Sequence, residues 1–300
     1  MTGACDAEDS APGINPAANI TAPAYRTGGT HRGATSATEP EPAAPPASIL
    51  TGVRSVLFAH AHPDDETIST GALIAELIAR GIRVTLLTAT RGEQGEVVAG
   101  PLSPLAGTDA LTAERERELA GALAALGITD HYWLGTPPAR VAGLRQHTYR
   151  DSGMTWVAEG VAGPADDAPA GALARADLAD VTADVAALIA TVQPDLVISY
   201  DDHGGYGHPD HVRIRDAALQ ASVALNVPFA EIREQQAPGV EWFELEHRRA
   251  TMTDALRHHA SQLTVFGDEV VHSGGQREPI HPSVGLRVVA PTQATLAAAD

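Results

Sequence analysis

The stretch that decides the fold is SVLFAHAHPDDE, residues Ser55–Glu66. It begins with an apolar run and ends with two histidines and three consecutive acids. A short apolar run that stops at a polar turn is typical of a buried β-strand. We therefore expect a strand whose carboxyl end carries titratable side chains.

Apolar runs and helical patterns alternate after this stretch. Further strands are predicted at RVTLLTAT (83–90), HYWLG (131–135), DLVISY (195–200), VEWFEL (240–245) and VGLRVVA (284–290). Helices are predicted at TGALIAELIARG (70–81), LTAERERELAGALAALG (111–127), VRIRDAALQASVAL (212–225) and TMTDALRHHASQL (251–263). Such alternation requires right-handed crossovers, so we predict an α/β, Rossmann-like, mostly parallel sheet with helices on both faces.

Residues 1–50 differ in composition from the rest of the chain. They are rich in Ala, Pro and Gly, as in EPEPAAPPAS, and have neither strand nor helix periodicity. We predict a disordered tail at 1–50 and a single domain at 51–300. A long Gly- and Pro-containing connection, 137–172, is expected to be either functional or loosely ordered.

The charge and hydropathy of the chain exclude several classes of partner. The formal net charge is −18, and no stripe rich in Lys and Arg interrupts it, so nucleic acid is not expected to bind. No apolar run is long enough to cross a membrane, and no secretory signal is recognisable at the N-terminus. We therefore expect a cytoplasmic protein. The single cysteine, Cys5, allows no intramolecular disulfide.

A second polar cluster, GGYGHPDH (204–211), follows the apolar run DLVISY. The carboxyl ends of parallel strands meet at one edge of a sheet, where ligands bind at the point of diverging connections. The two clusters are therefore expected to come together.

The two clusters supply the residue types of a metal site. A catalytic zinc centre takes three protein ligands and keeps one open position. His62, Asp65 and His211 provide such a set, and Asp64 is then free to act as general base on the attacking water. One Zn²⁺ per subunit is expected, and Fe²⁺ would also fit these ligands.

The remaining residues of the clusters have predicted supporting roles. We expect Asp210 to orient His208 and to favour its charged form, so that His208 stabilises an oxyanion or protonates a leaving amine. Glu66 is expected to cap the following helix, and His60 to pack beneath the site.

AHAHPDDE and GGYGHPDH together resemble the PIG-L/LmbE-like zinc deacetylases, over the segment from Val53 to Leu263. Within that family, TRGEQGEV, RERELAGAL and RDSGM look like the deacetylase of mycothiol biosynthesis, which acts on N-acetylglucosaminyl-inositol. The resemblance implies a hydrolase that removes acetyl from an N-acetylglucosamine moiety.

The resemblance also implies a role for each matching residue. It implies metal ligands at His62, Asp65 and His211, the base at Asp64, an oxyanion stabiliser or acid at His208 supported by Asp210, a mobile carbonyl-polarising Tyr206, and contacts to sugar or inositol hydroxyls from Glu96, Arg115 and Asp151. His258 and His259 are expected to be packed or surface residues of a helix.

Other functions remain open at this point. The same chemistry would serve a mycothiol S-conjugate amidase or a deacetylase of another N-acyl amino sugar. Two histidines and a carboxylate also form the triad of non-haem iron oxygenases, although the α/β pattern disfavours that class. A non-catalytic sugar-binding module would have no evident use for Asp64. The substrate is expected to be a small acetylated amino sugar, and the oligomeric state is left open.

Overall fold

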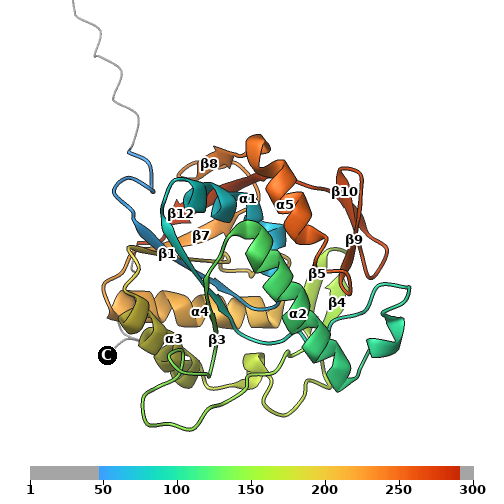
Figure 1. Ribbon diagram of the computed structural model, residues 1–300. Helices are drawn as coiled ribbons and strands as arrows, with labels where there is room; N and C mark the ends of the chain where they lie inside the picture. Colours follow the sequence, from blue (N-terminus) through green and yellow to red (C-terminus); the bar gives the residue numbers. More distant parts are fainter. Residues whose placement is uncertain (1–46, 291–300) are drawn as a thin grey trace, which may run out of the picture. The chain divides into compact units, whose positions relative to one another are not determined.

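A computed structural model describes residues 47–290 of the 300-residue chain (Figure 1). Residues 1–46 of the predicted tail lie outside the described residues.

The main element is a seven-stranded sheet with the strand order β3-β2-β1-β6-β7-β12-β8. Its strands are β1 (Ser55–His60), β2 (Arg83–Thr88), β3 (Asp130–Trp133), β6 (Leu196–Ser199), β7 (Phe229–Arg233), β8 (Glu241–Glu244) and β12 (Ser283–Val288). The pairs from β3 to β7 are parallel, whereas β12 runs antiparallel to both β7 and β8. The predicted mostly parallel α/β sheet is confirmed.

Strand β1 is buried on both faces because its apolar side chains alternate between two cores. Val56 and Phe58 pack into one core, and Leu57 and Ala59 into the other. Helices cover both faces, as predicted and as Figure 1 shows. The first core is closed by α1 (Asp65–Ala79), α2 (Asp109–Leu126) and α5 (Arg249–Leu256), and the second by α3 (Leu178–Val192) and α4 (Pro209–Ala224).

Smaller elements complete the described part of the chain. They are a hairpin of β4 (Met154–Ala158) and β5 (Val161–Pro164), an antiparallel sheet of β9 (Leu263–Phe266), β10 (Glu269–His272) and β11 (Arg277–Pro279), and short 3-10 helices at Ser103–Leu105, Leu173–Arg175 and Glu246–Arg248. The hairpin lies inside the connection predicted at 137–172. The helix predicted at 251–263 instead covers Arg249–Leu256, because the chain turns at His259 and enters β9.

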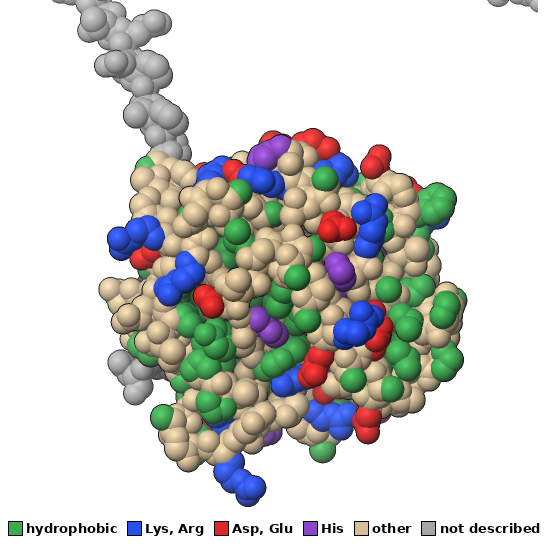
Figure 2. Space-filling view, viewed as in Figure 1, with side chains coloured by type: hydrophobic (Ala, Val, Ile, Leu, Met, Phe, Trp, Pro, Cys, Tyr) green, Lys and Arg blue, Asp and Glu red, His purple; other side chains and the backbone are tan. Residues whose placement is uncertain are grey.

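The surface agrees with the charge pattern of the sequence. On the face shown in Figure 2, arginine side chains lie scattered among acidic and polar ones and form no continuous stripe. Among the described residues, no helix has the length and apolar character needed to cross a bilayer.

The direction of the chain connections reverses between the neighbouring strands β1 and β6. From β1 the chain crosses to β2 on one side, and from β6 it crosses to β7 on the other. Such a reversal opens a crevice at the carboxyl ends of the two central strands. Both polar clusters of the sequence leave the sheet at this crevice.

Candidate active site

The two polar clusters begin two helices that point into the crevice. Asp64 is the N-cap of α1, so His62 and Asp65 lie on either side of the helix start. His208 is the N-cap of α4 and Pro209 is its first residue, where proline is well tolerated because the first N–H has no helical partner. His211 follows within the first turn of the same helix.

His62, Asp65 and His211 come together as predicted. Asp65 Oδ2 lies 3.2 Å from His62 Nδ1, and Asp65 Oδ1 lies 3.3 Å from His211 Nε2. His62 Nδ1 and His211 Nε2 are themselves 3.3 Å apart. Tetrahedral zinc with bonds of about 2.0–2.1 Å separates its ligand atoms by about 3.3–3.4 Å. Each side of the triangle formed by these three side chains is close to that length, with Asp65 contributing a different oxygen to each of its two sides.

Outer partners orient the two histidines. His211 Nδ1 donates to the Gly204 carbonyl at 3.1 Å, which leaves the Nε2 lone pair directed at the triangle. His62 Nε2 lies 3.3 Å from Asp210 Oδ2 and donates to it, which turns Nδ1 inward. Partners that fix the far nitrogen in this way are typical of metal-bound histidines.

The local charge also fits a cation. Burial opposes a positive charge on His62, yet Asp151, Asp210 and Asp65 together raise the pKa of His62 well above its usual value. Three carboxylates around one imidazole therefore create a negative environment. Inward-facing nitrogen and oxygen acceptors in such an environment are the donor set of a divalent metal centre.

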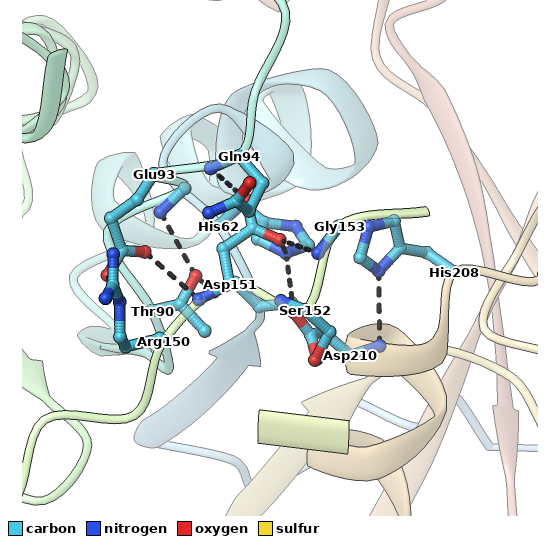
Figure 3. Close-up of polar contacts among 12 residues, drawn as sticks. His62, Thr90, Glu93, Gln94, Arg150, Asp151, Ser152, Gly153, His208 and Asp210 are labelled. Carbon is cyan, nitrogen blue, oxygen red and sulfur yellow. Dashed lines mark hydrogen bonds and ion pairs between the residues drawn. The ribbon is translucent and has the colours of Figure 1, made fainter. Parts of the chain in front are cut away.

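His208 is a further neighbour of this cluster. One nitrogen each of His62, His208 and His211 lie within 4.8 Å of one another. His208 Nδ1, however, accepts the backbone N–H of Asp210 at 3.1 Å (Figure 3), so only Nε2 is free to face the cavity. Asp65 makes the closer contacts to both His62 and His211.

The prediction that the Asp210 carboxylate orients His208 is wrong. That carboxylate accepts hydrogen bonds from the Ser152 backbone at 2.8 Å, from the Ala174 backbone at 3.1 Å and from His62. Burial and the neighbouring His62 and His211 lower the pKa of His208 to about 2. Both effects favour the neutral imidazole, and its Nδ1 already accepts the Asp210 backbone N–H.

Asp64 adopts an unusual backbone conformation at the edge of the cluster. Its φ is 117°, in a region that non-glycine residues rarely occupy. Its carboxylate accepts a hydrogen bond from Arg115 Nη2 at 3.1 Å. Burial raises the pKa of Asp64 to about 6, although Arg115 opposes this shift. A carboxylate with a pKa close to neutrality suits a general base.

A cavity of 620 Å³ opens at the cluster. Its lining includes every predicted site residue except Asp210, which lies behind them: His62, Asp64, Asp65, Glu96, Arg115, Asp151, Tyr206, His208 and His211. The volume is sufficient for a disaccharide-sized ligand.

The three predicted substrate contacts differ in their surroundings. Arg115 is buried and is held by Asp64 and the Gly92 carbonyl, so it is not a solvated member of a charged helix face. Asp151 accepts the backbone N–H groups of Gln94 and Gly153 (Figure 3). Glu96 and the partly exposed Tyr206 face the open part of the cavity.

Several site residues were missed by the sequence analysis. Tyr200 donates its hydroxyl to Asp65 Oδ2 at 2.7 Å and stacks its ring on His211. Ser152 donates its backbone N–H to the Asp210 carboxylate, and His259 Nε2 lies 2.9 Å from Glu66 Oε1. The position of Tyr200 at the end of a predicted central strand was the one available signal. His60 lies beneath the site, as expected, with Nε2 3.1 Å from Thr70 Oγ1.

The sequence model of one protein family matches this chain. The family is described as "PIG-L: GlcNAc-PI de-N-acetylase", and the match covers residues 57–222.

Two curated relatives carry the same name, 1D-myo-inositol 2-acetamido-2-deoxy-alpha-D-glucopyranoside deacetylase. The protein from Kineococcus radiotolerans is 47% identical over 170 residues, which are 57% of this chain and 45% of that protein. The protein from Kribbella flavida is 36% identical over 234 residues, which are 77% of this chain and 73% of that protein. The chain thus spans about half the length of the Kineococcus relative.

A solved structure has a similar fold. It is a deacetylase of the teicoplanin biosynthesis pathway, with a TM-score of 0.53 and 19% identity, covering 80% of this chain and 99% of that one. At this identity the likeness supports the fold alone.

Proposed function

Since the chain belongs to the PIG-L family, we propose that it is a zinc-dependent hydrolase that removes acetyl from N-acetylglucosaminyl-inositol, a step of mycothiol biosynthesis. The observation that carries this proposal is the position of Asp64, a half-buried carboxylate on a strained backbone, beside the proposed metal-ligand side chains in a cavity of 620 Å³. The names of the curated relatives supply the substrate.

His62, Asp65 and His211 would hold the ion. Zinc supplies Lewis acidity, which polarises the acetamide carbonyl and makes the attacking water more acidic. Fe²⁺ would fit the same donors. The oxygenase alternative is not favoured, because the cluster stands on a parallel α/β sheet and includes a base that oxygen activation does not need.

The residues of the chain carry the proton transfers. Asp64 accepts a proton from the attacking water as the new C–O bond forms, and passes it to the sugar nitrogen as the C–N bond breaks, so that acetate and a free amine leave. His208, neutral and protonated on Nε2, donates a hydrogen bond to the developing oxyanion. Tyr206 is placed to help at the same oxygen from the open side of the cavity.

The test is turnover by the zinc-loaded protein. We expect release of acetate and free amine from N-acetylglucosaminyl-inositol, and a loss of about 10²–10⁴-fold in kcat for Asp64→Asn with unchanged metal content. If the protein instead turns over only a mycothiol S-conjugate or another N-acyl glucosamine, that result would support the proposed chemistry and contradict the proposed substrate. Full activity of Asp64→Asn would refute the assignment of the base.

A further inference from the structure

Glu66 and His259 are buried ionisable residues that the proposed reaction does not use. Glu66 lies in the first turn of α1, and His259 in the turn between α5 and β9. Both side chains are fully buried, and His259 Nε2 lies 2.9 Å from Glu66 Oε1. Because a carboxylate only accepts, the imidazole nitrogen is the donor. Buried ion pairs add little net stability, since desolvation offsets their attraction, so this pair calls for another explanation.

The second oxygen of Glu66 contacts the main chain of the proposed base. Glu66 Oε2 accepts the backbone N–H of Asp64 at 3.0 Å. Asp64 has a φ of 117°, a strained conformation that a non-glycine residue keeps only where its surroundings hold it in place. The Asp64 carbonyl starts α1 by accepting from Thr67 and Ile68, both at 2.9 Å. The carbonyl of Asp64 is thus fixed by the helix, and its amide is fixed by Glu66.

We propose that Glu66 and His259 are positioning residues for Asp64. His259 holds the Glu66 carboxylate in one orientation, and that carboxylate fixes the Asp64 amide. The carboxylate of Asp64 is thereby directed at the cavity. The catalytic part of this inference rests on the proposed function, in which Asp64 is the base. The structural part, the fixing of the Asp64 backbone, does not.

The effect on turnover follows from the geometry. Displacing a reacting group by about 1 Å costs up to about 10²-fold, and loss of a supporting contact typically costs about 10–100-fold. The cavity lining includes neither Glu66 nor His259, so substrate affinity should change little. We expect His259→Leu to lower kcat by about 10–100-fold with an almost unchanged KM.

Two matched variants separate positioning from a general loss of stability. His259→Gln keeps an N–H donor near the position of Nε2 and is expected to recover most of the wild-type kcat. His258→Leu changes the exposed neighbour, which has no contact with Glu66 in the part of the chain that the structure describes, and should leave kcat unchanged. Glu66→Gln keeps the side-chain volume and carries the test if His259→Leu does not fold.

Amide exchange gives a readout that needs no activity. Measured by NMR on the metal-loaded protein, the Asp64 amide should exchange at least about tenfold faster in His259→Leu or Glu66→Gln, and at the wild-type rate in His259→Gln and His258→Leu. A folded His259→Leu protein with unchanged kcat and unchanged Asp64 exchange would overturn the proposal. If the wild-type protein shows no deacetylase activity, the proposed function fails, while the exchange data still decide whether this pair holds Asp64.

Discussion

At the residue scale, the hydrogen bond from Tyr200 occupies one oxygen of Asp65 and leaves the other available to bind a metal ion. Asp65 Oδ2 accepts the Tyr200 hydroxyl at 2.7 Å and the His62 backbone N–H at 2.8 Å. Oδ1 is left facing His211. The Tyr200 oxygen itself accepts the buried N–H of Ala61 at 2.9 Å, so the hydroxyl links the end of strand β1 to the metal ligand.

Replacing Tyr200 by Phe should weaken both the protein and its metal site. The Ala61 N–H loses its partner, which costs about 1–3 kcal/mol of unfolding free energy. Asp65 loses a donor that fixes its orientation, and zinc affinity should fall about 10–100-fold. Chelator competition measures the affinity, and urea unfolding of the metal-free protein measures the stability.

Tyr149→Phe is the matched control for this prediction. The Tyr149 hydroxyl is also buried and donates to a carboxylate, Asp184 of α3, at 2.9 Å. Its removal should reduce stability by a similar amount and leave zinc affinity unchanged. Equal losses of zinc affinity in the two variants would show that Tyr200 acts only through stability.

The sequence predicted the grouping of the site residues better than their contacts. Parallel strand ends meet by geometry, so the chain order of the two clusters was sufficient to place His62, Asp65 and His211 together. The partner of Asp210 could not be predicted, because the choice between His62 and His208 depends on side-chain directions at two helix starts. His259 was expected to be either packed or on the surface of a helix, and it is buried; nothing local to it indicates that α1 lies against it.

At the scale of elements, Glu76 joins α1 to the segment before α5. Its carboxylate accepts hydrogen bonds from Arg80 at 2.7 Å, His247 at 2.7 Å and Arg248 at 2.8 Å. Burial would raise the pKa of Glu76, but the hydrogen bonds from Arg248, His247 and Arg80 lower it from 4.5 to about 2. The folded protein therefore holds this carboxylate in its charged form.

Glu76→Gln should lower the unfolding free energy at pH 7 by about 1–3 kcal/mol. Because the folded pKa is depressed, the contribution of Glu76 is complete above the unfolded pKa and is lost as the pH falls toward 2. The difference between wild type and variant should accordingly shrink below pH 4.5 in urea titrations. Glu246→Gln, which removes the exposed pair with Arg249, is the control and should leave the unfolding free energy almost unchanged. A deficit that is the same at pH 3 and pH 7 would contradict the assignment.

Six strands of the main sheet were predicted, whereas β7 and the strands of the two smaller sheets were not. β1 is buried throughout and is apolar from Val56 to Ala59, which leaves a clear pattern. Helix α5 stops at Leu256, because His259 donates its backbone N–H to Leu256 and Ser261 is bound by Glu118 of α2. Both 240–245 and 284–290 were predicted as strands. The insertion of β12 between β7 and β8 depends on long-range pairing that no local pattern records.

At the scale of the whole described domain, the proposed metal ligands join its two halves. His62 and Asp65 follow β1, whereas His211 lies in α4, after β6. An ion that binds only the folded chain stabilises it in proportion to its saturation, by about 2.7 kcal/mol at a hundredfold excess over Kd. Zinc should therefore raise the Tm of the wild-type protein in calorimetry and leave the Tm of His211→Ala almost unchanged. An equal increase in both proteins would place the ion elsewhere.

The pairing of β1 with β6 has a consequence for protein synthesis. Val56 pairs with Leu196, so the central pair of the sheet cannot close until most of the chain has left the ribosome. Until then the nascent chain carries His62 and its three acids without His211. If His62, Asp65 and His211 hold zinc as proposed, capture of the ion would be a late event of biogenesis. A chain interrupted before α4 would then have no complete set of ligands to compete for zinc in the cell.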